Sequence, residues 1–254
     1  MSKLSIRQRM QRNLRNNSLR DNEDLPAIEF LNSLDKEKEY KLLEIGSGLC
    51  RFIDKIAPIY PNIKITCYEI NPKLIALAQS KGFSVLQGNF LENTIEDNTF
   101  DIIHCSHVIE HFHYPEITNV LDEFVRIVKT NGTIIIRSPL MWNGFYYDID
   151  HIRPYLPESI TNYFTYEQQQ KQSSHSIDVK KIWYRTSAKQ LKMIDATSIW
   201  LLCPPVKWLI NFFRTRKNGI YQWLWDRFRC PATEPNGYVI IFEKKDQPQS
   251  NFFD

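Results

Sequence analysis

The segment LLEIGSGLC, residues 42–50, contains the side chains whose types and spacing first suggest chemistry. Gly46 and Gly48 stand directly behind the carboxylate of Glu44, in a chain that has only 8 glycines among 254 residues. A glycine turn lets the backbone approach a ligand closely because no Cβ intrudes. The dinucleotide fingerprint GxGxxG fails, since Arg51 occupies its third glycine position. A carboxylate this close repels phosphate and attracts a cation, so we expect a ligand that brings positive charge to the turn.

Polar side chains also follow the next three apolar runs of the chain. Glu69 ends one run, and its carboxylate can accept two hydrogen bonds from the hydroxyls of a ribose. Asn89 offers an amide for the edge of an adenine, and Phe90 offers a ring for its face. Ser106 and His107 follow the fourth run. The pattern predicts a nucleoside site that is lined by the ends of consecutive strands.

Two histidines are candidates for a general base. His151 lies in YDIDHIRPY beside Asp148 and Asp150, and a carboxylate that orients an imidazole is a known arrangement of a base. A surface ion pair at the entry of a helix would have the same sequence, so both interpretations stay open. His107 is the second candidate.

The run HVIEH, residues 107–111, also has the composition of a metal site. His107, Glu110 and His111 offer two imidazoles and one carboxylate, which are ligands of divalent ions. Capping and packing at the start of a helix explain Glu110 and His111 without an ion. We therefore expect no metal.

Alternating strands and helices must position these side chains. Five runs have the apolar character and the turn boundaries of buried strands, namely 40–45, 63–69, 83–87, 100–106 and 133–139. The clearest helix begins at Pro115, repeats apolar residues at i, i+3 and i+4, and stops at Asn131 and Gly132. Such alternation indicates a mostly parallel sheet with helices on both faces. Ligands of these sheets bind at the carboxyl ends of the strands.

The remaining segments give the expected domain organisation. Residues 1–37 form a basic, helical extension, residues 38–245 form the main domain, and residues 246–254 form a tail. The extension is expected to be a solvated helix, with a phosphate-seeking or membrane-surface arm or a targeting segment left open. Two further strands are expected at 177–185 and 237–245.

Between the last two strands lies an insertion, residues 189–232, that is rich in aromatic and basic side chains. An extra helical layer, a dimer contact or a lid explains its composition. As a lid, residues 200–229 would meet an anionic or lipid-linked acceptor at a membrane surface.

Composition excludes several classes of protein. A net charge of +3 does not by itself indicate a nucleic-acid partner. The 5 cysteines are scattered and form no CxxC pair, so neither a disulfide framework nor a zinc module is indicated. The chain shows no signal-peptide pattern and no apolar run of spanning length. We expect a cytoplasmic protein, with membrane association left open.

Five segments together resemble the class I S-adenosylmethionine-dependent methyltransferases: LLEIGSGLCRF, CYEINPKLIALAQSKG, QGNF, FDIIHCSHVIEHF and NGTIIIRSP. The resemblance covers residues 38–140 and, by the order of the elements, extends to 245. It implies an α/β fold with a Rossmann-like, doubly wound sheet of seven strands, mostly parallel with an antiparallel last strand.

The resemblance also implies S-adenosylmethionine as cofactor, held by Glu44, Gly46, Ser47, Gly48, Glu69, Ile70, Asn89, Phe90 and Ser106. In the family pattern the residues of the turn hold the methionine end, with Glu44 near its ammonium. Glu69 binds the ribose, Ile70 packs on the adenine, and Asn89 faces the adenine amino group. Ser106 lies near the methyl donor. Two departures from the pattern are Cys50, where a third glycine is common, and Asn89, where aspartate is common.

We therefore expect a methyltransferase that methylates an oxygen of a small-molecule acceptor or of a glycan- or lipid-linked one. Methyl transfer from a sulfonium needs orientation and exclusion of water, and a base only where the acceptor loses a proton. His151, oriented by Asp150, and His107 are the expected catalytic residues. An RNA methyltransferase and a catalytically inactive, cofactor-binding partner subunit stay open as alternatives, although we expect no nucleic-acid partner. The sequence leaves the oligomeric state open.

Overall fold

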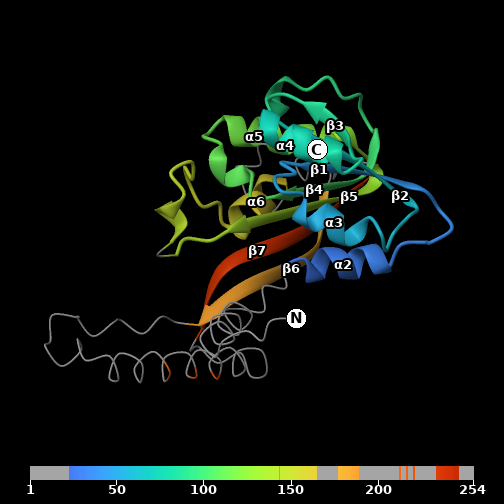
Figure 1. The fold of residues 1–254 in the computed structure, drawn as a ribbon. Coiled ribbons are helices and arrows are strands. Elements are labelled where there is room, and N and C mark those ends of the chain that lie inside the picture. The colour runs from blue at the N-terminus through green and yellow to red at the C-terminus, as the bar shows by residue number, and fades with distance from the viewer. Residues whose placement is uncertain are drawn as a thin grey trace, which may run out of the picture. The chain divides into compact units, whose positions relative to one another are not determined.

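A seven-stranded sheet forms the centre of the computed structural model, which describes residues 23–142, 144–164, 177–188 and 233–245 together with Phe212, Arg216 and Ile220. The strand order is β3-β2-β1-β4-β5-β7-β6 (Figure 1). The strands are β1 (Tyr40–Ile45), β2 (Ile63–Glu69), β3 (Ser84–Gln87), β4 (Phe100–Ser106), β5 (Val128–Pro139), β6 (Ile177–Ala188) and β7 (Thr233–Lys244). Strands β1 to β5 pair in parallel, and β7 pairs antiparallel with β5. The predicted fold class is confirmed.

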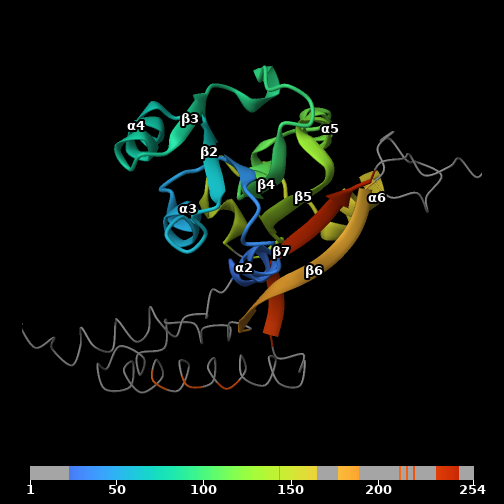
Figure 2. The same ribbon diagram turned by 90° about the vertical axis from the view of Figure 1, so that its right-hand side faces the viewer.

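Helices cover both faces of this sheet (Figure 2). The α-helices are α2 (Leu25–Asn32), α3 (Arg51–Ile56), α4 (Pro72–Ser80), α5 (Glu116–Ile127) and α6 (Pro157–Phe164). Short 3-10 turns are η1 (Phe90–Glu92), η2 (Ile109–His111) and η3 (Phe145–Tyr147). Alternate strand residues face two separate cores, one with α2, α3 and α4 and the other with α5 and α6. A sheet buried on both faces explains why its central strands read as continuous apolar runs.

The register of the parallel strands places the predicted polar residues at one edge. Ile45 lies opposite Tyr68 of β2 and Cys105 of β4. The residues that follow these three, Gly46, Glu69 and Ser106, therefore emerge side by side at the carboxyl ends of the strands.

Several element boundaries differ from the sequence prediction: β6 reaches Ala188 and β7 begins at Thr233, and the boundary between α5 and β5 lies earlier in the chain. Helix α5 ends at Ile127, whereas the predicted helix ran to Asn131. Strand β5 already begins at Val128, because Val128 pairs with Phe100 before the register shifts to Ile102 opposite Thr133. Asn131 adopts a positive φ of 59° within that irregular stretch. The stop signal at Asn131 therefore marks an irregularity inside a strand and not the end of the helix.

Several predictions concern residues outside the described part of the chain. Those residues are the basic segment 1–22, most of the insertion 189–232 and the tail 246–254. The predicted domain division therefore stays a prediction.

Ala27 and Leu31 of α2 pack in the same core as Phe52 of α3. Glu23–Tyr184 and residues 237–245 form one compact unit, while the ends of β6 and β7 from Arg185 and up to Asn236 belong to a second.

The side chain of Arg126 on α5 ties the loop after η1 to this helix. Its guanidinium donates to both carboxylate oxygens of Glu123, at 2.9 and 2.7 Å, to the Ile95 carbonyl at 2.7 Å and to Asp97 at 2.6 Å. The hydrogen bonds from Arg126, helped by one from Asn93, hold the pKa of Glu123 below its ordinary value despite partial burial.

This pair predicts a pH dependence of stability. A depressed folded-state pKa means that the stabilisation is present above the unfolded-state pKa of about 4.3 and is lost as the pH falls through the lower folded-state value. We expect the free energy of unfolding, measured with urea between pH 6 and pH 3, to fall less steeply in Glu123→Gln than in the wild type. Glu37→Gln, at an exposed position, is the control, and equal slopes for all three proteins would contradict the prediction.

Candidate functional site

The glycine turn between β1 and α3 is left-handed at three positions. Gly46, Gly48 and Cys50 have φ values of 68°, 51° and 62°. The amide of Gly46 donates to the Tyr68 carbonyl at 2.9 Å, which fixes the start of the turn on β2. A Cβ added at Gly46 would lie 2.4 Å from Cγ2 of Val108. Gly46 is therefore required both by its φ and by the close approach of the segment after β4.

Glu69 connects this turn to the neighbouring strand end. Its Oε2 accepts from the amide of Gly48 at 3.0 Å, and its Oε1 accepts from the amides of Ile70 and Asn71, each at 3.0 Å. The residue is only 6% exposed. A carboxylate has about four acceptor positions, so these three bonds leave capacity on Oε2 for a ligand hydroxyl. The predicted cofactor residues Gly48, Glu69 and Ile70 are thus brought together.

The predicted adenine residues lie in different environments. Ile70 is 64% exposed, and it borders a shallow hollow that Gln87, Gly88 and α4 also line. Asn89 caps η1, since its Oδ1 accepts from the amide of Leu91 at 3.2 Å. Phe90 is buried and packs on Tyr68 and Phe124, with centroid distances of 5.2 and 5.5 Å. The ring of Phe90 therefore supports the core beneath this edge.

Glu44 points into the sheet's core on the α3 side. Its Oε2 lies 2.7 Å from Nδ1 of His104, and both residues are buried. The imidazole of His104 stacks on the ring of Phe52 at a centroid distance of 4.0 Å. The sequence analysis missed His104, because the register that places it opposite Glu44 cannot be read from the sequence. Ser47, next to the glycines, is also buried.

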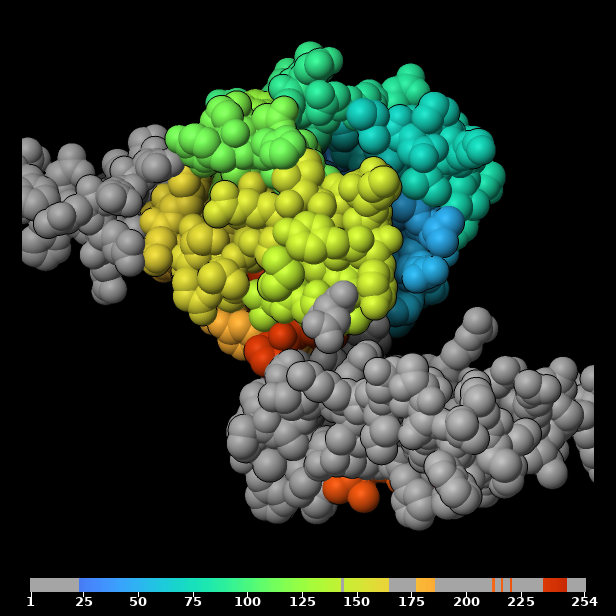
Figure 3. All heavy atoms as spheres, turned by 90° about the vertical axis from the view of Figure 1, so that its left-hand side faces the viewer, coloured from blue at the N-terminus to red at the C-terminus, as the bar shows by residue number. Residues whose placement is uncertain are grey.

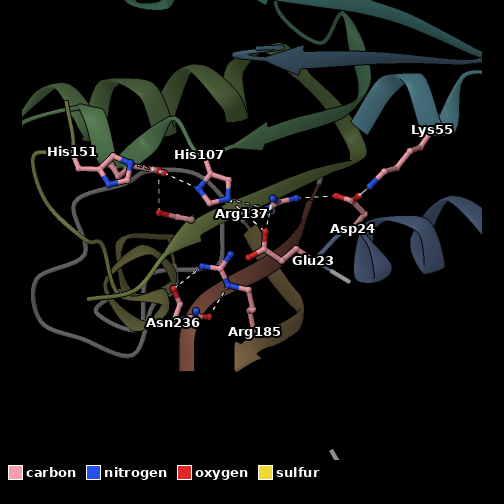
Figure 4. Close-up of polar contacts among 10 residues, drawn as sticks. Glu23, Asp24, Lys55, His107, Arg137, His151, Arg185 and Asn236 are labelled. Atoms are coloured by element: carbon pink, nitrogen blue, oxygen red, sulfur yellow. Dashed lines mark hydrogen bonds and ion pairs between the residues drawn. The ribbon is translucent and has the colours of Figure 1, made fainter. Parts of the chain in front are cut away.

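His107 lies among charged residues at the end of β4 (Figure 4). Its Nδ1 is 3.1 Å from Glu110 Oε1, and its Nε2 is 3.2 Å from Nε of Arg137 and 3.6 Å from Oε2 of Glu23. Burial lowers the pKa of His107, but hydrogen bonding to Glu110 and Glu23 outweighs it, and the pKa is raised. Arg137 also pairs with Glu23 and Asp24 of the segment before α2. Both ring nitrogens of His107 are therefore engaged.

The ring of His151 is oriented by a backbone carbonyl and not by Asp150. Its Nδ1 donates to the Phe145 carbonyl at 2.6 Å. The nearest aspartate oxygen is that of Asp148, 3.9 Å from Nε2. The carbonyl of Asp150 instead accepts from Nδ1 of His111 at 2.9 Å. His107 and His151 are brought to the same part of the site, where Glu110 lies 3.1 and 4.0 Å from them (Figure 4).

The segment after β5 exposes a run of large apolar side chains. They are Met141, Trp142, Tyr146, Tyr147 and Ile149, the last two being 85% and 94% exposed. Figure 3 shows this segment in yellow-green across one face of the domain, with a recess between it and the segments around α4 and α5. The sequence analysis did not single out these residues. No helix within the described ranges is both long and apolar enough to cross a bilayer. The aromatic and basic residues 200–229 lie outside those ranges, except that Arg216 lies over the ring of Phe212 at 5.0 Å.

Comparison with known proteins gives one matching family. Residues 43–136 match the model of a methyltransferase domain. An uncharacterized protein from Methanocaldococcus jannaschii is 28% identical over 107 residues, which cover 42% of this chain and 44% of that protein. The match thus spans less than half the length of this curated relative.

Solved structures of similar fold include methyltransferases. An S-adenosylmethionine-dependent methyltransferase from Archaeoglobus fulgidus aligns with a TM-score of 0.57 and 22% identity, over 86% of this chain and 92% of that chain. A phosphoethanolamine N-methyltransferase from Haemonchus contortus, in complex with phosphomonomethylethanolamine and S-adenosylhomocysteine, aligns with a TM-score of 0.54 and 14% identity, over 89% and 53%. At these identities the likeness establishes the fold.

Proposed function

We propose, from the premise that this chain belongs to the class I S-adenosylmethionine-dependent methyltransferases, that it transfers a methyl group to an oxygen of a small-molecule acceptor, free or linked to a glycan or lipid. One observation carries the proposal. The Glu69 carboxylate binds the amide of Gly48, so an acidic strand end and a glycine turn share one edge of the sheet. That edge is where ligands of doubly wound sheets bind.

The residues at this edge fit S-adenosylmethionine. The turn of Gly46 and Gly48 would hold the methionine end, because the backbone is open at Gly48, where a Cβ would meet only the Gly46 carbonyl, at 3.9 Å. The remaining acceptor capacity of Glu69 suits a ribose hydroxyl, and the exposed side chain of Ile70 suits an adenine face. When bound, the cofactor supplies a methyl group on a sulfonium, open to in-line displacement.

The chain's own part in the reaction is mainly to orient the acceptor and exclude water. Ser106, at the end of β4, and the segment after β5 would border the acceptor. The exposed apolar side chains of that segment, Tyr147 and Ile149 among them, support an acceptor with an apolar or lipid-linked portion. Contact with a membrane surface through residues 141–149, or through residues 200–229, belongs to the same proposal.

A hydroxyl acceptor must lose its proton, and His151 is the better base of the two predicted histidines. Donation from Nδ1 to the Phe145 carbonyl leaves the lone pair on Nε2, which lies 3.9 Å from Oδ2 of Asp148 and 4.0 Å from Oε1 of Glu110. His107 is less suited because both of its nitrogens are engaged. Asp150 would contribute through its carbonyl, which fixes the neighbouring ring of His111.

Two measurements test the proposal. Calorimetry should show one S-adenosylmethionine per chain, and incubation with the methyl-labelled cofactor and a cell extract should label a low-molecular-mass or lipid-soluble fraction. We expect His151→Ala to lower the labelling rate by about 100-fold, the lower range for loss of a general base, with an unchanged cofactor affinity. His113→Ala, at an exposed position of the preceding loop, is the control. A chain that binds no cofactor, or label confined to RNA, would refute the proposal.

A further inference from the structure

We propose that Glu110, His111 and His151 form a binding site for one divalent transition-metal ion of the Zn²⁺ class. Within the described residues, one ligand atom from each of the three lies within 4.8 Å of the other two. The three come from two separate segments, since Glu110 and His111 belong to η2 and His151 to the loop after η3. The sequence analysis considered His107 with Glu110 and His111 and expected no metal. The structure replaces His107 with His151, because the ring nitrogens of His107 face Glu110 and Arg137.

The tautomers of both imidazoles are those of metal ligands. Nδ1 of His151 lies 2.6 Å from the Phe145 carbonyl, and Nδ1 of His111 lies 2.9 Å from the Asp150 carbonyl. A carbonyl oxygen only accepts, so each Nδ1 carries the proton and each Nε2 presents a lone pair. Metal-binding histidines donate their second nitrogen in this way, which fixes the tautomer and the ring. The two rings lie side by side, with centroids 5.0 Å apart.

The carboxylate of Glu110 is also held in place. Glu110 is fully buried, and its Oε1 lies 4.0 Å from Nε2 of His151. Its oxygens are oriented by Nδ1 of His107 at 3.1 Å and by the hydroxyl of Ser138 at 3.2 Å. Ligating carboxylates are supported by such outer hydrogen bonds. A buried carboxylate whose partners are an imidazole and a hydroxyl gains from a cation beside it.

The backbone holds the two ligand-bearing segments together. The carbonyl of Glu110 accepts from the amides of Ile152 and Arg153, at 3.0 and 3.3 Å. The residue after His151 is therefore fastened to the residue that supplies the carboxylate. The three ligand atoms lie at most 4.8 Å apart, and they need only approach one another to the spacing that metal–ligand bonds of about 2.0–2.2 Å require.

The ligand set indicates the type of site. Two imidazoles and one carboxylate are the protein ligands of catalytic zinc sites, which leave the fourth position for water or substrate. Both histidines are half-buried, so that position is reachable. Ion binding itself requires no S-adenosylmethionine. The role of the ion rests on the proposed function: an acceptor hydroxyl at the open position would be made more acidic by the ion and would lose its proton to solvent water. With the ion bound, Nε2 of His151 would act as a ligand, in place of the role of base that it has in the ion-free site.

The test uses the full-length chain without a polyhistidine tag, stripped with a chelator and titrated with Zn²⁺ by calorimetry and with Co²⁺ by visible absorption. We expect one ion per chain. His111→Ala and His151→Ala should each weaken Zn²⁺ binding at least about 100-fold and remove the tetrahedral Co²⁺ spectrum. His113→Ala, a histidine in the same loop with an exposed side chain, should change neither.

A second readout keeps the proposal independent of folding and of activity. Nitrogen-15 spectra of the metal-free protein should show His111 and His151 protonated at Nδ1, and Zn²⁺ should shift their Nε2 resonances. Each variant is also titrated with S-adenosylmethionine, which should bind as in the wild type if the fold is intact. Absence of a bound ion in the wild type, or Zn²⁺ affinity unchanged in the double variant His111→Ala/His151→Ala, would overturn the metal site. Neither result would affect the proposed cofactor site.

Discussion

Replacing Glu69 by alanine is expected to weaken S-adenosylmethionine binding by about 100-fold. Hydrogen bonds to a charged group contribute about 1.5–3 kcal/mol each, and one ribose hydroxyl on the remaining acceptor position of the carboxylate gives about 3 kcal/mol at the upper value. Each 1.4 kcal/mol is a factor of ten in affinity. The variant also frees the amide of Gly48, which in the wild type donates to Oε2 at 3.0 Å, so the turn keeps only the bond from the Gly46 amide to the Tyr68 carbonyl as its support on β2. Calorimetric titration with the cofactor measures the effect.

Two comparisons make the Glu69 result specific. Glu69→Gln keeps the shape of the side chain and one acceptor oxygen, so an intermediate loss is expected. Glu39→Ala removes an exposed carboxylate that pairs with Lys64 at the opposite end of β1 and should leave the affinity unchanged. Cofactor binding that is equally strong in Glu69→Ala and the wild type would remove this edge of the sheet from the cofactor site.

Replacing Gly46 by alanine is expected to destabilise the fold by about 2–5 kcal/mol and to abolish measurable cofactor binding. A left-handed φ of 68° costs a residue with a Cβ about 1–2 kcal/mol. The new Cβ would also meet Val108 Cγ2 at 2.4 Å, and overpacking of that kind costs about 1–3 kcal/mol. Urea unfolding and cofactor titration together measure both consequences.

Gly82 and Val108 provide the matched controls. Gly82 has a φ of 86°, but a Cβ there would meet nothing within 4 Å, so Gly82→Ala reports the backbone strain alone. In Gly46→Ala/Val108→Ala the clashing methyl group is gone, and the double variant should recover the overpacking part of the loss. If Gly46→Ala and Gly82→Ala lower the free energy of unfolding by the same amount, the close approach of Val108 to Gly46 does not contribute to the effect of Gly46→Ala.

Much of the sheet could be predicted from the sequence because its signals are local. The runs that became β1, β2, β4 and the second half of β5 are apolar and end in turn residues, and Asn71 caps α4 through its side chain at 3.0 Å, as its place before Pro72 suggests. The end of α5 was misplaced, since pairing of Val128 with Phe100 outweighed the local helix pattern. Pairing between strands that are distant in the chain produces no periodic pattern in the sequence.

In the candidate site too, features with local signals could be predicted from the sequence and features that depend on long-range contacts could not. Gly46, Gly48 and Glu69 were identified because strand ends in a parallel sheet share an edge, and the structure brings them together. The partnership of His104 with Glu44 depends on register. The convergence of His151 on Glu110 depends on the path of a loop about forty residues further along the chain, and the ring is oriented by a main-chain carbonyl that any residue type could supply. Such contacts have no sequence signature.

The two hydrogen bonds that the Glu110 carbonyl accepts from the amides of Ile152 and Arg153 have a consequence for specificity. These hydrogen bonds fasten the loop after η3, which would border the acceptor, to the segment after β4. We therefore expect the two segments to move together. An acceptor pocket between two such segments would select acceptors by rigid shape complementarity and not by induced fit. Diversification of acceptor choice among relatives would then proceed through the exposed residues Met141, Trp142 and 146–149, which lie outside these hydrogen bonds, while the hydrogen-bonded residues set the common chemistry.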